Sequence, residues 1–203
     1  YLASRGITVF DVPGVRLHPD LPYYEEGGEV GRFPVLLALF LSPERQGITL
    51  HRIYLTRDGH KAPVPAPKKT MPVPGGLNLA GAAVRLGPAG PSLGLAEGIE
   101  TALAVMTATG DICWATTTAC LLEKVKLPPV VKRVTVWADN DESKTGLKAA
   151  VRLTERLVKE GRRVRIKIPQ RPAGQKSWDW ADVLATQGRR RGGAPEKRLD
   201  SRF

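Results

Sequence analysis

The sequence has few of the residues that mark disulfide-rich, zinc-binding or membrane-spanning proteins. Its two cysteines, Cys113 and Cys120, stand seven positions apart, with no CxxC pair and no histidine pair nearby. This pattern argues against a zinc site in this fragment and favours reduced thiols in a cytoplasmic protein. No apolar run reaches the roughly 18 residues that a membrane-spanning helix needs, and we expect no signal peptide. The first residue is Tyr1 rather than Met, so we expect a fragment or a processed product of a longer protein.

Acidic residues are also scarce: there are 20 of them against 31 lysines and arginines, which gives a formal net charge of +11. A basic balance of this size predicts a polyanionic partner. Nucleic acid is favoured over a membrane because no strongly amphipathic basic helix stands out, although a basic surface can also serve solubility alone. With 42% hydrophobic and 25% charged residues, the sequence is otherwise that of an ordinary globular protein of one large or two small domains.

One stretch organises the chain, residues 134–141, which read Val-Thr-Val-Trp-Ala-Asp-Asn-Asp. Its β-branched and aromatic residues predict a short buried strand that runs directly into Asp139 and Asp141. Side chains at the carboxyl end of such a strand project into the crevice where open α/β sheets bind ligands. Two carboxylates there can hold one divalent cation. Alternatively, they only form a turn and cap the next helix, expected over residues 144–160.

A second acidic segment has the same place relative to a predicted strand. The strand covers residues 93–96 and is followed by Glu97, Gly98 and Glu100 at the start of a helix over residues 99–109. A carboxylate in the first turn of a helix is favoured by the helix dipole, so either glutamate can be merely structural.

A third acidic segment lies downstream, where Asp179 and Asp182 follow Lys176. The two aspartates are three residues apart, so they share one face of a helical turn. Acidic segments at several strand ends, separated by helices, converge on one crevice when the strands are parallel. The sequence therefore predicts an α/β fold with a mostly parallel sheet, flanked by helices, and an acidic site at its carboxyl edge.

In this order, the three acidic motifs resemble a Toprim domain, and more narrowly the Toprim domains of phage- and plasmid-type DNA primases. The motifs are Glu97-Gly98 with Glu100, Asp139-x-Asp141 followed by Gly146 and Ala149, and Lys176 with Asp179 and Asp182. The resemblance covers roughly residues 30–185. It implies a Toprim-like sheet preceded by a small mixed or antiparallel basic subdomain, with Glu97 as the catalytic glutamate and Glu100 as its motif companion.

The resemblance also implies metal-dependent chemistry on phosphates. Mg²⁺ or Mn²⁺ would be held by the carboxylates of Glu97, Asp139 and Asp141, with Asp179 as a further ligand or outer group. Lys176 would contact the triphosphate of an incoming nucleotide. We therefore expect Glu97, Asp139, Asp141 and Lys176 to be the catalytic residues, and nucleoside triphosphates to be the substrates.

A basic, proline-rich segment precedes the acidic motifs. Arg52 lies in a predicted strand, and Lys61, Lys68 and Lys69 follow it in a stretch that five prolines keep extended. An extended strap of cations beside an acidic metal site predicts contacts with the phosphates of a template or nucleotide. The alternative is that the strap is only a solvated linker.

Hydroxyl and basic side chains near the other motifs complete the set of candidates for binding nucleic acid or nucleotides. Thr116 and Thr117 follow a predicted strand over residues 112–115 and can donate hydrogen bonds to phosphate oxygens, or bond only their own backbone. Lys144 and Lys148 lie on the polar face of the helix that follows Asp141.

We expect three parts along the chain. Residues 1–92 form a basic subdomain with a β-meander and the strap, residues 93–186 form the Toprim domain, and residues 187–203 form a basic, disordered tail. Within the first part, residues 1–5 form a short helical piece that Gly6 ends, and a turn-rich section follows as far as residue 29. Strands over residues 33–41 and 47–56 make a hairpin.

These features predict a primase-type nucleotidyltransferase of the DNA-directed RNA polymerase kind. It would make short primers on single-stranded DNA, as part of a larger replication protein of a phage, plasmid or other mobile element. Its partners would be the template, nucleotides and a helicase or relaxase in the same chain or complex, and no membrane. A Toprim-type nuclease is one alternative, since the same carboxylates can activate water. A non-catalytic nucleic-acid-binding module that keeps its metal ligands is the other.

Overall fold

The computed structural model describes residues 1–190, with only the course of the backbone for residues 188–190. Within them, the first half of the chain is antiparallel sheet. It comprises η1 (Ala3–Arg5), β1 (Val15–Glu25), β2 (Gly28–Leu41), β3 (Gly47–Tyr54), β4 (Lys68–Thr70) and β5 (Ala83–Val84). Strand β2 is the centre of this half, because β1, β3 and β5 all pair with it.

The second half alternates strands with helices. Its main strands are β6 (Ser92–Ala96), β7 (Cys113–Ala115), β8 (Arg133–Trp137) and β10 (Arg163–Lys167). Its helices are α1 (Ile99–Thr109), α2 (Ala119–Lys124), α3 (Thr145–Lys159) and α4 (Trp180–Arg190). The four strands are parallel, so the chain must cross over between them, and α1, α2 and α3 lie in these crossovers. Two short strands, β9 (Asn140–Asp141) and β11 (Ser177–Trp178), form a separate ribbon.

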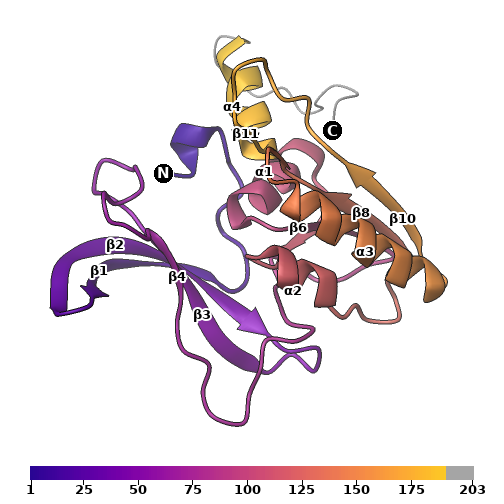
Figure 1. The fold of residues 1–203 in the computed structure, drawn as a ribbon, viewed down its shortest axis with the longest axis horizontal. Helices are drawn as coiled ribbons and strands as arrows, with labels where there is room; N and C mark the ends of the chain where they lie inside the picture. The colour runs from indigo at the N-terminus through magenta and orange to yellow at the C-terminus, as the bar shows by residue number, and fades with distance from the viewer. Residues whose placement is uncertain (191–203) are drawn as a thin grey trace.

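Strand β5 joins the two halves into one sheet of nine strands. It pairs with β2 on one side and with β7 on the other, which gives the order β10-β8-β6-β7-β5-β2-β3-β4, with β1 also on β2. Figure 1 shows the antiparallel half with β1 to β4, in indigo and purple, beside the half that carries α1, α2 and α3. The predicted class is confirmed: a mostly parallel sheet flanked by helices follows an antiparallel part. A domain boundary near residue 92 stays a prediction, because the sheet runs through it without a break.

Helices cover both faces of the parallel half. On one face, Leu153 and Leu157 of α3 belong to a buried cluster with Val134 and Val136 of β8. On the other face, α1 and α4 pack over β6 and β7, and the rings of Trp137 and Trp180 meet edge to face at 5.0 Å. Among residues 1–190, no helix has the length and apolar character needed to cross a membrane.

The short helical piece predicted for residues 1–5 is confirmed as η1, which ends at Gly6, but the turn-rich section predicted after it was wrong for residues 15–25. Residues 15–25 form β1, which pairs with β2 and makes a register shift between His18 and Leu21, around Pro19. Proline is tolerated in this strand because β1 has β2 as its only partner within the described residues, so some of its amides face away from the sheet.

Two other segments are more regular than expected. The end of the strap forms β4, which is held in place by its pairing with His51, Arg52 and Ile53 of β3. Helix α4 extends to Arg190, so the first four residues of the expected tail are helical. The rest of that tail, residues 191–203, lies outside the described residues.

Candidate active site

The carboxyl ends of β6 and β8 bring the first two predicted carboxylates together. The strands are neighbours, with Ala96 aligned to Trp137, so Glu97 and Asp139 both leave the sheet at the same edge. Both side chains are partly buried. Among residues 1–190, neither carboxylate has a cation within ion-pair distance. This carboxyl edge is the first part of the candidate site.

Glu97 lies against the first turn of α3. A Cβ atom on Gly146 would come within 3.1 Å of the Oε2 atom of Glu97, so any larger residue there would press on the carboxylate. Burial and the nearby Asp141 carboxylate raise the pKa of Glu97, while Lys68 and the backbone amide of Ala119 oppose the shift. The structure thus explains why a glycine suits position 146, because the missing Cβ atom lets α3 approach the Glu97 carboxylate closely.

Asp139 is strongly perturbed. Burial, followed by the carboxylates of Asp179 and Glu97, raises its pKa from 3.8 to about 7. A hydrogen bond of 3.3 Å from Thr101 Oγ1 to Asp139 Oδ1 and the charge of Lys68 act in the opposite direction. A partly desolvated carboxyl group crowded by other carboxylates is typical of a functional site.

Asp141 has a structural task as well. Its Oδ1 atom accepts hydrogen bonds from Ser143 Oγ and from the backbone amide of Lys144, both at 2.7 Å. These bonds close the turn that leads into α3, as the capping interpretation expected for this residue. Because Asp141 also raises the pKa of Glu97, it lies within the electrostatic reach of the carboxyl edge.

Asp179 and Asp182 cap α4 reciprocally and are joined by a distant arginine. Asp179 Oδ1 accepts a bond of 2.7 Å from the amide of Asp182, and Asp182 Oδ2 accepts one of 3.0 Å from the amide of Asp179. Arg5 Nη2 lies 3.3 Å from Asp179 Oδ1 and 3.0 Å from Asp182 Oδ1. Burial raises the pKa of Asp179 while Arg5 opposes the shift. Asp179 therefore borders the edge, already paired with a cation.

Glu100 lies in the seam, which we define as the contact of α1 with β4 and the N-terminal turn. It is 2% exposed, and its Oε1 atom is 2.8 Å from both the hydroxyl of Tyr1 and Nζ of Lys68. Burial alone would raise the pKa of Glu100, but Lys68 and the hydrogen bonds lower it to about 2. Glu100 is thus a buried, compensated charge that holds the two halves together.

The four strap cations divide between two faces of β3 and β4. The register sets Lys68 opposite Ile53 and Lys69 opposite Arg52, and successive residues of a strand face opposite ways. Lys68 reaches Glu100 in the seam. Burial and the charge of Lys68 lower the pKa of Lys61, which also lies in the field of Glu100 and Asp179. Lys61 and Lys68 therefore lie on the side of the carboxylates.

Arg52 and Lys69 lie on the other face. Arg52 Nη1 donates a bond of 3.0 Å to the Tyr54 hydroxyl, and Lys69 Nζ is 3.0 Å from Glu25 Oε1 and 4.0 Å from the centroid of the Tyr23 ring. These contacts brace β1 against β4. Nucleic-acid contacts of Arg52 and Lys69 stay a prediction, but on a surface separate from the carboxyl edge.

The two candidate threonines differ. Thr116 is fully buried, and its hydroxyl donates to the backbone carbonyls of Ala96 and Thr118, both at 3.4 Å. Thr117 has a φ of +65°, and its amide donates a bond of 2.7 Å to the carbonyl oxygen of Glu97. Its buried Oγ1 has no hydrogen-bond partner among the described residues. Strained backbone beside Glu97 favours Thr117 over Thr116 as a residue of the site.

The three remaining candidate lysines are exposed at the rim. Lys144 and Lys148 lie at the start of α3. Lys176 precedes β11, and its carbonyl oxygen accepts a bond of 3.2 Å from the amide of Glu142, next to β9. The β9–β11 ribbon therefore brings Lys176 near Asp141, although 35 residues of sequence separate them.

Comparison with known families agrees with this geometry. Residues 92–190 match the Toprim domain family. This segment is a Toprim domain. Residues 1–86 match a family described only as a domain of unknown function, DUF7146. No curated protein matches the sequence.

Solved structures place the Toprim domain in a primase-like fold. The primase fragment of the bacteriophage T7 primase-helicase protein has a TM-score of 0.52 at 15% identity, over 87% of this chain and 64% of its own. The E. coli primase catalytic core gives 0.51 at 16% identity, over 92% and 55%. A DnaG primase catalytic domain bound to single-stranded DNA gives 0.51 at 14% identity, over 94% and 54%. The chain thus spans between half and two thirds of these structures, and identities this low establish the fold alone.

The donor set of this Toprim domain fits a hard divalent cation, the kind of ion that Toprim domains generally bind. As the side chains stand, no three Asp, Glu, His or Cys residues among residues 1–190 are placed to hold one ion together. However, Glu97 raises the pKa of Asp139, and no ion pair within residues 1–190 compensates either carboxylate. A dication would relieve this repulsion, and oxygen ligands suit Mg²⁺.

Sequence reasoning missed several residues around the site. Arg5 is 174 positions from Asp179, and Tyr1 is 99 positions from Glu100. No local pattern signals either contact, because both depend on the N-terminal turn lying beside α1 and α4. Thr101, whose hydroxyl donates to Asp139, was missed as well. Its place in the first helical turn after the Glu97-Gly98 motif could have drawn attention to it.

Proposed function

We propose that this chain is the catalytic part of a DNA primase-type, metal-dependent nucleotidyltransferase. It would make short primers on single-stranded DNA within a larger replication protein of a phage, plasmid or other mobile element. Support comes from the Toprim domain and from the fold shared with the T7 and E. coli primase structures. We also propose that it works in the cytoplasm with a helicase or relaxase; the T7 fragment belongs to a primase-helicase protein.

One observation carries the proposal: uncompensated carboxylates of the parallel half meet cations of the antiparallel half across one junction of the sheet. Glu97 and Asp139 come from the parallel half. Lys68 comes from the antiparallel half and lies in the electrostatic field of both carboxylates, and the neighbouring Lys61 lies in the field of Glu100 and Asp179. Carboxylates suit metal ions and cations suit phosphates, which is the combination that nucleotide transfer needs.

Each residue then has a definite task. Glu97, Asp139 and Asp141 would hold the divalent ion, with Asp179 at the border, and the ion when bound would neutralise charge that develops on the phosphate. Lys61 and Lys176 would orient the anionic groups of a nucleotide or template. Gly146 keeps the space that the Glu97 carboxylate needs. The burial that raises the pKa of Glu97 also limits the access of water to its carboxylate.

The experiment is incubation of the protein with single-stranded templates, labelled ribonucleoside triphosphates and Mg²⁺ or Mn²⁺. Glu97→Gln serves as the inactive control, because it removes a charge at the edge and keeps the size of the side chain. Glu142→Gln makes the same chemical change at an exposed carboxylate outside the edge.

Template-dependent oligonucleotides from the wild type and from Glu142→Gln, but not from Glu97→Gln, are the expected result. Shortening of the template instead of synthesis would replace the proposal with a Toprim nuclease. Template binding without synthesis or cleavage, at any divalent-ion concentration, would leave a nucleic-acid-binding module.

A further inference from the structure

Part of one sheet face carries no helix. Strands β8 and β10 turn Val134, Val136, Val164 and Ile166 toward α3. On the opposite side, α1 and α4 cover β6, β7 and the Trp137 end of β8. Parallel sheets are normally covered on both faces, so a bare stretch over β8 and β10 calls for an explanation.

Cations occupy this bare stretch in register. Arg133 of β8 lies beside Arg163 of β10, and Arg165 and Lys167 follow at alternate positions of β10. Alternate residues of a strand are about 6.6 Å apart, and neighbouring strands about 4.8 Å apart. We call these four residues the β10 strip. It is a row of three cations with a fourth beside its first member.

The strip has the carboxylate of Asp111 in its field, which lines the same hollow as Arg133 and Arg165 but forms no ion pair with the strip within the described residues. Among residues 1–190, none of its four members forms an ion pair; Arg133 Nε donates a bond of 2.9 Å to Ser92 Oγ, and Lys167 Nζ lies 4.8 Å from the centroid of a Trp137 ring. Burial and the neighbouring Arg165 lower the pKa of Lys167, while Asp111 opposes the shift. Like charges on adjacent strands destabilise a sheet, and an anionic ligand would offset that cost.

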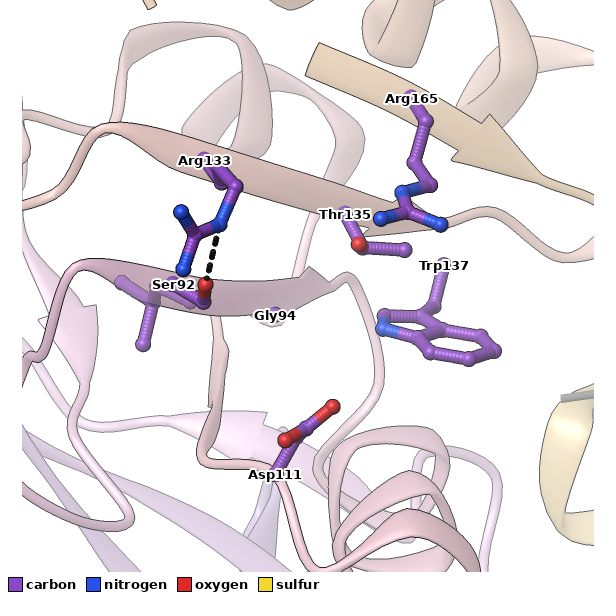
Figure 2. Close-up of a pocket in the computed structure, with 8 residues that line it drawn as sticks. Ser92, Gly94, Asp111, Arg133, Thr135, Trp137 and Arg165 are labelled. Carbon is purple, nitrogen blue, oxygen red and sulfur yellow. Dashed lines mark hydrogen bonds between the residues drawn. The ribbon is translucent and has the colours of Figure 1, made fainter. Parts of the chain in front are cut away.

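Figure 2 shows a hollow beside the strip, with Arg133 and Ser92 toward one end and Arg165, Thr135 and Trp137 toward the other. Its floor is closed at Gly94, where a Cβ atom would come within 2.9 Å of Cys113 Sγ. The hollow has a volume of about 120 Å³. Pockets for small ligands span about 300–1,000 Å³, so this one is too small to enclose a nucleotide. An open row of cations with a shallow hollow instead suits a strand that passes over it.

We infer that the β10 strip binds the phosphates of single-stranded nucleic acid on a path that leads away from the carboxyl edge. Strand β8 carries Arg133, Thr135 and Trp137 on this face and reaches Asp139 two residues later, and Lys167 lies beside Trp137. The strip therefore begins next to the proposed active site. Its row along β10 is about 13 Å long, enough for at most about four phosphates at the 3.4 Å spacing of a stacked strand. Only the identity of the polymer rests on the proposed function.

The test is equilibrium binding of a labelled single-stranded oligonucleotide in EDTA, over a range of salt concentrations. The strip variant is Arg133→Gln with Arg163→Gln and Arg165→Gln. The control is Lys124→Gln with Lys126→Gln and Lys159→Gln, which removes the same charge from exposed positions on and beside α2 and α3. Melting temperatures of both variants verify folding. Because no divalent ion or turnover is involved, the result is independent of the proposed enzymatic activity.

The strip variant should bind more weakly, and its log–log salt slope should fall by about 0.7 for each lost phosphate contact, up to about 2 in total. The control should keep a slope near that of the wild type. Single-stranded DNA should also protect Lys167 from acetylation in the wild type. Equal slopes for the two variants, with Lys167 unprotected, would overturn the inference and leave the bare face to a protein partner.

Discussion

The carboxyl edge and the seam lie within one helical turn of each other, yet they treat their carboxylates in opposite ways. At the edge, burial and neighbouring carboxylates raise the pKa values of Glu97 and Asp139, and no ion pair compensates either among residues 1–190. In the seam, Glu100 has a lysine and a tyrosine hydroxyl at 2.8 Å, and its pKa is lowered to about 2.

The difference separates function from stability. Uncompensated charge costs folding free energy, and it is retained where an ion or substrate supplies the missing partner. Compensated charge in the seam fixes the antiparallel half against α1 and so holds Lys68 within the field of Glu97 and Asp139.

Glu97→Gln should reduce nucleotide incorporation by about 10²-fold or more, because it removes a charge that holds or activates the reacting groups. The melting temperature should equal that of the wild type or exceed it, because the variant removes a carboxylate whose charged form is destabilised by burial and by Asp141. Turnover and thermal unfolding of the same preparation check both parts. An active Glu97→Gln protein would assign the chemistry to another carboxylate.

Glu100→Gln should lower the free energy of unfolding by about 2–3 kcal/mol, because it breaks a buried ion pair whose lysine is only partly exposed. Since the folded pKa of about 2 lies below the ordinary 4.5, this stabilisation is fully present above pH 4.5 and disappears between pH 4.5 and 2. Denaturant titrations at several pH values measure it. A double-mutant cycle with Lys68→Met tests whether the loss belongs to the pair.

Asp139→Asn should stabilise the protein at pH 8 by at least about 1 kcal/mol in the absence of divalent ions. The folded pKa of about 7 lies above the ordinary 3.8, so the folded state binds more protons between these values and wild-type stability falls as pH rises through them. At pH 4 the variant and the wild type should be nearly equal. Identical pH profiles would show that Asp139 is solvated rather than crowded.

Gly146→Ala should separate stability from activity. Alanine favours a helix over glycine by up to about 1 kcal/mol, but its Cβ atom would come within 3.1 Å of Glu97 Oε2. We expect unchanged or increased stability and a loss of turnover of about three- to tenfold, from a displacement of a few tenths of an ångström. Unchanged turnover would mean that the position of Glu97 is not critical.

Lys61→Ala and Lys69→Ala form the smallest comparison, between cations on opposite faces of the antiparallel half. Lys61→Ala should reduce the salt slope of oligonucleotide binding by about 0.7, the effect of one phosphate contact. Lys69→Ala should leave the slope unchanged, because Lys69 pairs with Glu25 at the surface of the other face. The reverse pattern would place the nucleic-acid surface on the face of Arg52 and Lys69, beside the Tyr23 ring.

Local patterns in the sequence were sufficient to predict the parallel half and its acidic edge. The strands before Glu97 and Asp139 are short runs of apolar residues bounded by polar ones. The helix after Asp141 carries a clear apolar stripe, and the helix after Glu97 is buried from Ile99 to Met106. Parallel strands connected by helices put their carboxyl ends on one edge, so local patterns were sufficient to place Glu97 beside Asp139. Of the two tasks that the Asp139–Asp141 spacing left open, the structure shows one, since Asp141 closes the turn into α3, and the metal site stays a prediction.

Which carboxylates have a compensating partner depends on long-range contacts that local patterns do not predict. Arg5, Tyr1 and Lys68 reach their acidic partners across 174, 99 and 32 positions, and no periodicity encodes such contacts. The division of the strap cations depended on β4, a three-residue strand whose pairing with β3 sends Lys68 and Lys69 to opposite faces. The bare face over β10 also depends on the tertiary structure. The alternation of Arg163, Arg165 and Lys167 predicts one solvated side of the strand, but it does not say whether a helix covers that side. Long-range packing supplies this information, and it is decided by the whole fold rather than by neighbouring residues.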